Sequence, residues 1–170
     1  GNFEEPKSAS NSAAIMLCLD AHLDIVRPGL MLYGVSPLGT PDERLKPVMT
    51  FTSRVLALRT VQQGEAVGYG ARWCALDVCT IAVVSVGYAD GYPQWAPDGT
   101  PVLVNGQRAT IAGRVSMDTL SIEVSGLDVS VGDSVTLWGA GLPIETVAAA
   151  MVASPYALLT GVSARVPREI

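Results

Sequence analysis

The sequence has 170 residues, of which 49% are hydrophobic and 16% charged, and its formal net charge at pH 7 is −5. This length and apolar content suit one folded domain, or one domain and a fragment of another. The negative charge argues against a nucleic-acid-binding surface, which needs a basic face. Apolar runs are short and interrupted by Asp, Arg or Gly, so we expect no membrane span and no secretory signal after Gly1.

Three cysteines and one histidine limit the possible chemistry. Cys18, Cys74 and Cys79 are odd in number and lack the spacing of metal ligands, so we expect reduced thiols in a cytoplasmic protein. With His22 as the sole histidine we expect no zinc site, and a Cys–His or Ser–His pair would require His22 itself to lie in the site.

The N-terminal quarter of the chain predicts α/β structure. The run from Ser10 to Leu19, polar and then apolar, predicts a short helix with a polar cap. The mostly apolar stretch from Ile25 to Gly34 (IVRPGLMLYG) predicts a strand buried on both faces, as in a parallel α/β sheet. The next segment, 36–47, is rich in proline and charged residues and predicts a linker along the surface.

Beyond Pro47 the pattern changes to short strands separated by turns. The stretch 48–61 partly alternates between polar and apolar residues, and Asn105-Gly106 is a hairpin signature. Further strands are expected at 80–86, 100–104, 108–113, 119–124 and 134–138. Short strands at this spacing predict an antiparallel sheet that closes on itself, a barrel or a sandwich.

Two short helices are expected at the C-terminal end. One begins at Pro143, and the other is capped by Ser154 and ends at Gly161. The chain is therefore predicted to be mainly β, with a short α/β segment joined to an all-β module.

Two features of the N-terminal part point either to structure or to chemistry. Asn11-Ser12 at a helix start offers N–H groups and a hydroxyl suited to an anion, although an ordinary N-cap is the commoner explanation. Arg27 lies within an apolar stretch, where burial of an unpaired guanidinium costs several kcal/mol. An arginine in a strand usually faces the surface or forms a salt bridge, but the apolar neighbours Val26 and Pro28 raise the chance that Arg27 faces a ligand.

Turns of the β part hold further candidates. Tyr69 lies between two glycines in GEAVGYGARW, as a lid over its own core or as an exposed phenol on backbone that approaches a ligand. Asp90, in a glycine-rich turn after Tyr88, is able to bond its own backbone. Arg114 and Asp118 are four residues apart, and a salt bridge between them is the simplest interpretation.

Taken together and in order, several stretches resemble the C-terminal part of bacterial alanine racemase: NSAA, VRPGLMLYG, VGYGARW, VGYADGYP, GRVSMD, SPYALLTG and RVPR. The resemblance implies an antiparallel β-barrel-like C-terminal domain of a fold-III pyridoxal-phosphate enzyme, preceded by the tail of a (β/α)8 barrel. Residues 1–44 would be that tail and a linker, and residues 45–170 the β-domain. It also implies a homodimer in which each β-domain leans over the partner's barrel, so that the active site is shared.

The implied activity is interconversion of L-alanine and D-alanine with pyridoxal 5'-phosphate, supplying D-alanine for peptidoglycan. Racemisation needs an acid/base group on each face of a planar carbanion, and the cofactor takes up the charge. Tyr69 resembles the catalytic tyrosine, which exchanges the α-proton on one face at the partner's cofactor. A lysine on the other face carries that cofactor. A phenol, with a pKa ordinarily near ~10, acts as a base only where nearby cations lower that value.

The resemblance assigns other residues to the cofactor or the substrate. Arg27 resembles the arginine at the pyridine nitrogen, and because a guanidinium stays protonated it cannot readily give that nitrogen a proton. This restrains electron withdrawal and limits side reactions. The phosphate contacts match Ser12, the backbone of Gly29 and Leu30, and Tyr156. The substrate side matches Tyr88, which narrows the path to the site, Arg114, and the pair Met117 and Asp118, which line the partner's site.

Three features depart from the family pattern. Ser8 stands where a histidine usually precedes the phosphate-binding serine by four residues, which leaves open how Arg27 is held. Gln94 stands where an arginine often follows GYADGYP. Lys7 and Lys46 both lie outside the cofactor motif, so the chain carries one catalytic base of two. We therefore expect a C-terminal fragment that is inactive alone.

Two other functions remain open at this point. Another fold-III pyridoxal-phosphate enzyme, such as an amino-acid decarboxylase, would place an acidic residue at the ring nitrogen and a cysteine near the substrate. In this sequence Arg27 stands at the position of the acidic residue and Tyr69 at the position of the cysteine. A non-catalytic β-barrel binding module would need a natural start near residue 1, against which the expected strand at 25–34 argues.

Overall fold

The computed structural model describes residues 5–169 and divides into two compact units, Gly1–Met49 and Thr50–Ile170. In the first unit, helix α1 spans Ser12–Leu17, and two 3-10 turns follow at Leu19–Ala21 (η1) and Leu30–Tyr33 (η2).

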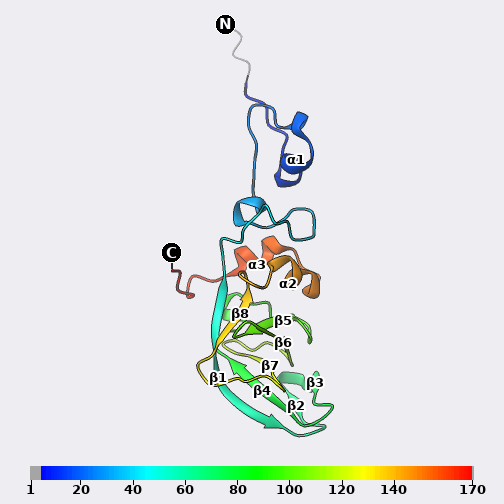
Figure 1. Ribbon diagram of the computed structural model, residues 1–170, viewed down its shortest axis with the longest axis vertical. Coiled ribbons are helices and arrows are strands. Elements are labelled where there is room, and N and C mark those ends of the chain that lie inside the picture. The colour runs from blue at the N-terminus through cyan, green and yellow to red at the C-terminus, as the bar shows by residue number, and fades with distance from the viewer. Residues whose placement is uncertain (1–4, 170) are drawn as a thin grey trace. The chain divides into compact units, whose positions relative to one another are not determined.

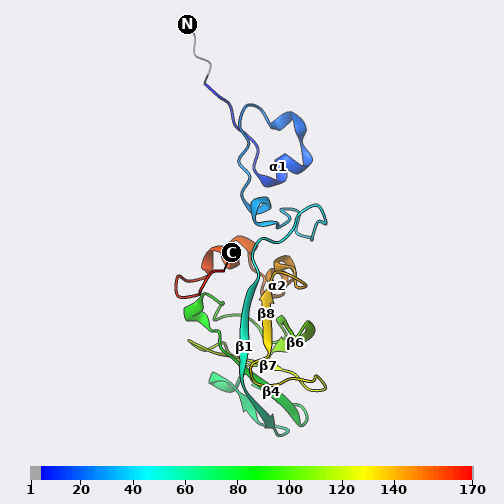
Figure 2. The same ribbon diagram turned by 60° about the vertical axis from the view of Figure 1, so that its left-hand side comes forward.

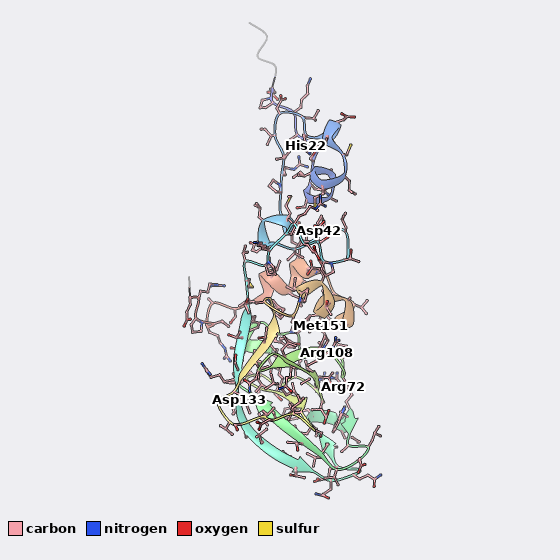
Figure 3. The ribbon with its side chains drawn as sticks, in the orientation of Figure 1. His22, Asp42, Arg72, Arg108, Asp133 and Met151 are labelled. Atoms are coloured by element: carbon pink, nitrogen blue, oxygen red, sulfur yellow. The ribbon has the colours of Figure 1, made fainter. Side chains whose placement is uncertain are left out.

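The predicted N-terminal helix with its polar cap is confirmed by α1. The side chain of Asn11 accepts a hydrogen bond from the Ala14 amide at 3.0 Å, which satisfies one of the free N–H groups of the first turn. His22, labelled in Figure 3, uses Nε2 to donate to the carbonyl oxygen of Ile15 at 3.0 Å. The single histidine is thus bonded to the backbone of α1.

The predicted strand from Ile25 to Gly34 is wrong, because this stretch holds the 3-10 turn η2 instead. Pro28 has no N–H to pair, and Gly29 has φ −119° and ψ −85°, outside the extended region. The amide of Arg27 donates to the Ser10 carbonyl at 2.8 Å rather than to a neighbouring strand. Residues 5–49 contain no strand that could pair with it.

The second unit is a closed antiparallel barrel with the strand order β1-β4-β7-β6-β5-β8 (Figure 1). It closes because β1 pairs with β4 on one side and with β8 on the other. The strands are β1 Phe51–Val61, β4 Cys79–Val84, β5 Pro101–Val104, β6 Gln107–Ile111, β7 Leu120–Glu123 and β8 Ser134–Trp138. The prediction of a mainly β chain with an antiparallel sheet closed on itself is confirmed.

The predicted hairpin joins β5 and β6 through Asn105 and Gly106. Both have positive φ, 49° and 79°, as a type I′ turn requires, and Val104 pairs with Gln107. The carboxylate of Asp133 (Figure 3) accepts a hydrogen bond from the Asn105 side chain at 2.7 Å. The turn is therefore tied to the loop that leads into β8.

Aromatic rings fill part of the barrel core. Tyr92 stacks on Trp138 with ring centroids 5.8 Å apart, and Phe51 tilts against the same ring at 4.8 Å. All three side chains are buried. Outside the barrel, the short strands β2 (Ala66–Val67) and β3 (Trp73–Cys74) form a separate two-stranded sheet.

Two helices follow the last strand, α2 at Ile144–Met151 and α3 at Pro155–Gly161. Pro143 is the N-cap of α2, so this helix begins one residue after the predicted position. Ser154 caps α3 by accepting from the Tyr156 amide at 3.3 Å, as predicted. Figures 1 and 2 show both helices at one end of the barrel and the β2–β3 pair at the other.

Among residues 5–169, no single helix has the length and apolar character needed to cross a membrane. Only α2 and α3 taken together, bent by 106° at their junction, meet that test of length and composition.

Tyr92 offers a test of the barrel core. Its hydroxyl has no hydrogen-bond partner among residues 5–169, and burial raises the pKa of the phenol, which stays protonated. Tyr92→Phe keeps the stacked ring and removes a desolvated polar group, so the free energy of unfolding should rise by about 1 kcal/mol in urea titrations.

Tyr92→Leu is the matched control for this substitution. It removes the ring that stacks on Trp138 and leaves a cavity, so the free energy of unfolding should fall by about 2 kcal/mol. A loss of stability in Tyr92→Phe as large as in Tyr92→Leu would contradict the unpaired state of the hydroxyl.

Candidate active site

Three loops of the barrel unit carry five of the candidate residues. The 3-10 turn η3 (Tyr69–Ala71) lies between β2 and β3, η4 (Tyr88–Asp90) follows β4, and residues 112–119 join β6 to β7. The last residue of β4 pairs with the first of β7, and β7 pairs in turn with β6. The loop after β4 and the loop between β6 and β7 therefore leave the barrel at the same end.

Direct backbone contact joins η4 to the β6–β7 loop. The amide of Tyr88 donates to the Ser116 carbonyl at 3.0 Å, and the amide of Ala89 donates to the Met117 carbonyl at 2.9 Å. A Cβ atom at Gly87 would lie 2.3 Å from the carbonyl oxygen of Met117, so only glycine permits this approach. The spacing of Tyr88 and Met117 is therefore set by the main chain.

The third loop, η3, meets the same β6–β7 loop at Gly113. A Cβ atom there would lie 2.4 Å from the Val67 carbonyl oxygen, at the end of β2. The residue after Gly113 is Arg114, and the residue after Gly68 is Tyr69. The two backbones are thus close enough to bring a guanidinium and a phenol to one surface.

Tyr69 projects into solvent, with 72% of its surface exposed. Its neighbours Gly68 and Gly70 have φ of 77° and 75°, a left-handed backbone that non-glycine residues rarely adopt. The interpretation of Tyr69 as a lid over its own core is therefore wrong. The flanking glycines serve a turn that exposes the phenol.

Two hollows adjoin the exposed phenol. One of about 320 Å³ is lined by Tyr69, Gly70, Arg72, Gln94, Trp95 and Arg114. A second, of about 700 Å³, is lined by Tyr69, Tyr88, Gln94, Arg114, Val115, Ser116, Met117, Asp118 and Thr119. The structure therefore brings together five of the predicted residues: Tyr69, Tyr88, Arg114, Met117 and Asp118.

The expected salt bridge between Arg114 and Asp118 does not form. Asp118 instead accepts a hydrogen bond from Arg165 Nη2 at 2.6 Å. Within residues 5–169, Arg114 forms no ion pair, and Arg114 lines both hollows. The positive charge beside Tyr69 is consequently not neutralised by a neighbouring carboxylate.

Arg165 was not among the predicted site residues, although it begins the RVPR stretch. Its Nε donates to Asp90 Oδ1 at 2.7 Å while its Nη2 donates to Asp118, so it bridges η4 and the β6–β7 loop. The Ser163 amide also donates to the Asp90 carbonyl at 2.9 Å. The C-terminal segment is thereby fastened to two loops that carry candidate residues.

Asp90 combines the predicted local turn with this longer-range contact. Its Oδ2 accepts from the Gly87 amide at 2.8 Å, as expected of an aspartate that bonds its own backbone. Burial opposes ionisation of the carboxyl, but the hydrogen bonds from Arg165 and Gly87 outweigh it and hold the pKa of Asp90 below its ordinary value. The carboxylate is therefore charged at neutral pH.

In the first unit, Ser12 lies beside two of the other predicted phosphate contacts, Gly29 and Leu30. Its buried hydroxyl accepts a hydrogen bond from the Gly29 amide at 2.9 Å, next to Leu30. Arg27 donates from Nη1 to the hydroxyl of Ser8. Ser8, the residue that departs from the family pattern, is thus the one that holds Arg27. Tyr156 lies in the first turn of α3, in the second unit, with 45% of its surface exposed.

No group of three or more His, Cys, Asp and Glu side chains within residues 5–169 is arranged to hold a metal ion. The site is built instead from phenols, guanidinium groups and one carboxylate on glycine-rich loops.

Comparison with known families agrees with this geometry. Residues 48–170 match the model of the alanine racemase C-terminal domain, and residues 2–37 match that of the alanine racemase N-terminal domain. The chain belongs to the alanine racemase family.

Individual relatives extend the match over nearly the whole chain. The biosynthetic alanine racemase of Pseudomonas aeruginosa is 51% identical over 169 residues, which cover 97% of this chain and 47% of that protein. Its crystal structure superposes with a TM-score of 0.94 over 97% of this chain and 47% of that one. The crystal structure of alanine racemase from Bartonella henselae with covalently bound pyridoxal phosphate superposes with a TM-score of 0.88 at 35% identity. The match covers 95% of this chain and 46% of that one. The chain spans about half the length of the curated relatives that it matches.

The bridge from Arg165 predicts a pH-dependent contribution to stability. Because the pKa of Asp90 is lowered in the folded state, its contribution is fully present above the unfolded value of about 4 and is lost as the pH falls through the folded value. Asp90→Asn should therefore lower the free energy of unfolding by about 1 kcal/mol at pH 7, and the difference should shrink below about pH 4.

Asp118→Asn is the control, since this carboxylate bonds the same arginine but its side chain is 60% exposed. Its effect at pH 7 should be smaller than that of Asp90→Asn. Urea unfolding of both variants at pH 7 and at acidic pH checks this, and a pH-independent loss in Asp90→Asn would contradict it.

Proposed function

We propose that this chain is part of a pyridoxal-phosphate-dependent alanine racemase that interconverts L-alanine and D-alanine. The observation that carries the proposal is the exposed Tyr69 phenol, held between two glycines beside the unpaired guanidinium of Arg114. Family membership and the bound pyridoxal phosphate of the Bartonella henselae relative supply the reaction class. A cytoplasmic location and a supply of D-alanine for peptidoglycan belong to the same proposal.

Residues 1–44 would form the tail of a (β/α)8 barrel and a linker, and residues 45–170 the C-terminal β-domain. The proposal is supported by the separate matches of residues 2–37 and 48–170 to the two alanine racemase domains.

The residues present fit the proposed cofactor. Ser12 offers a hydroxyl beside the backbone of Gly29 and Leu30, which suits a phosphate group, and Tyr156 would add a phenol. Arg27, held by Ser8, would face the ring nitrogen, where its permanent charge prevents proton donation to the ring. Bound pyridoxal phosphate supplies the electron sink that stabilises negative charge at the α-carbon.

Tyr69 would move the proton at the α-carbon on one face of the substrate. Arg114 lines the same hollows as Tyr69. Tyr88, in the larger hollow, would narrow the path of the substrate, while Met117 and Asp118 would line the site of the partner subunit. The second base, a lysine that carries the cofactor, would come from a part of the protein outside this sequence.

Substitution of Tyr69 in the full-length protein tests its proposed role. Tyr69→Phe keeps the ring and removes the group that carries the proton, so kcat for alanine racemisation should fall by about 10²-fold or more. Tyr33→Phe is the control, because Tyr33 is also an exposed tyrosine but has no assigned role. Racemisation assays in which Tyr69→Phe and Tyr33→Phe both keep wild-type turnover would contradict the proposed role of Tyr69.

The shared site makes a separate prediction about assembly. Tyr69, Met117 and Asp118 would act on the partner's substrate, whereas Ser12, Arg27 and Tyr156 would hold the cofactor of their own subunit. Heterodimers of a Tyr69→Phe subunit and a subunit without the cofactor lysine would then contain one site with both bases and one with neither. Activity should return to about half of wild type per dimer.

Mixing and reassembly of the two full-length variants, followed by racemisation assays, checks this prediction. Heterodimers that are shown to form but remain inactive would contradict the shared site, because each site would then lack one base.

A further inference from the structure

The turn that carries Tyr69 needs a restraint from outside itself. Its N-cap, Gly68, has no side chain with which to make a capping bond, and Gly68, Gly70 and Ala71 all have left-handed φ. A Cβ atom at Gly70 would meet nothing within 4 Å, so packing around that residue does not hold the turn. Glycine-rich backbone of this kind has many alternative conformations, and the phenol would move with it.

Arg72, the residue directly after the turn, supplies several such restraints. Its Nε donates to Asp98 Oδ2 at 3.0 Å and its Nη2 donates to Asp98 Oδ1 at 3.1 Å, a two-pronged contact. The same Nη2 donates to the carbonyl oxygens of Ala96 at 3.0 Å and Gly113 at 3.1 Å. Figure 3 shows Arg72 beside β3.

Asp98 completes the arrangement from the opposite side. Its Oδ1 accepts a hydrogen bond from the Gly113 amide at 2.7 Å, while the Gly113 carbonyl accepts from Arg72. Both backbone groups of Gly113 are therefore bound by this ion pair. Three segments meet there: the Tyr69 turn, the turn at 96–98, and the loop that continues into Arg114.

We propose that Arg72 and Asp98 are positioning residues that hold the Tyr69 phenol and the Arg114 guanidinium in register for proton transfer. The proposal rests on the proposed function of Tyr69 and adds residues to which that function gave no role. Tyr69, Arg72 and Arg114 line one hollow of about 320 Å³, so a displaced turn would change the place of the phenol relative to Arg114.

The chemistry of the contact requires arginine. A planar guanidinium reaches both carboxylate oxygens and two carbonyl groups at once, whereas the ammonium of lysine is a single point charge with three donors. Arg72→Lys therefore keeps the charge and loses the geometry. Asp98→Asn keeps the shape and loses the negative charge and one acceptor.

Kinetics of the full-length enzyme test the proposal. Arg72→Lys and Asp98→Asn should each lower kcat by about 10-fold, with KM within about twofold of wild type, because a misplaced acid/base group slows the proton transfer. Arg44→Lys is the matched control: Arg44 also contacts an aspartate, Asp42, through Nε and Nη2, outside the proposed site, and its kcat should stay at the wild-type value.

A double substitution separates positioning from a general loss of structure. If the pair acts through the phenol, adding Arg72→Lys to Tyr69→Phe should leave the remaining rate unchanged, because the group to be positioned is already absent. A further 10-fold loss in the double variant would overturn the proposal. Wild-type kcat in both Arg72→Lys and Asp98→Asn would overturn it as well.

The Tyr69→Phe single variant distinguishes this failure from failure of the proposed function. A large loss of activity in Tyr69→Phe with full activity in Arg72→Lys and Asp98→Asn would contradict only the proposal that Arg72 and Asp98 are positioning residues. Wild-type activity in Tyr69→Phe would contradict the proposed role of the phenol, and the positioning role of Arg72 and Asp98 with it. If Arg72→Lys does not fold, Asp98→Asn and its combination with Tyr69→Phe decide the question by the same criteria.

Discussion

Close contact between the backbones of three loops is the constraint on which the candidate site depends. At Gly87 and Gly113 the carbonyl oxygens of Met117 and Val67 occupy the space that a Cβ atom would need. The loops therefore meet through their main chains, and side-chain packing does not keep them apart. The barrel makes this meeting possible because β4, β7 and β6 are neighbours in the closed sheet.

Charged side chains add to this arrangement by bonding the backbone of the loops. Arg72 and Asp98 bind both backbone groups of Gly113, and Arg165 bridges Asp90 and Asp118. An exposed phenol such as Tyr69 cannot be fixed by burial, so hydrogen bonds to the surrounding loops are the remaining means of fixing it. This agrees with the proposed chemistry, in which one proton carrier must meet one face of a substrate that is bound elsewhere.

Local signals in the sequence predicted the parts of the fold that depend on neighbouring residues. Asn105-Gly106 specifies its turn through positive φ at both positions, and Ser154 caps α3 with its own hydroxyl. The prediction of a strand at 25–34 was wrong because a strand also needs a partner strand, which residues 5–49 do not provide. An apolar pattern alone does not reveal that absence.

The candidate site was predicted less completely. Tyr69 stood out through its glycines, but the same sequence fitted a buried lid and an exposed phenol, and only the fold separates the two. The partnership of Arg72 and Asp98 joins residues 26 apart, and that of Arg165 and Asp90 joins residues 75 apart. No spacing rule connects such pairs, so the expected pairing of Arg114 with Asp118 was the natural prediction and was wrong.

The central claim is that the Tyr69 phenol serves one face of the substrate. Washout of α-deuterium from L-alanine and from D-alanine, each measured in full-length wild-type and Tyr69→Phe protein, tests it most directly. We expect the substitution to slow washout from L-alanine by about 10²-fold and washout from D-alanine far less, since the other face has its own base. Equal slowing for both enantiomers, or none for either, would contradict the account.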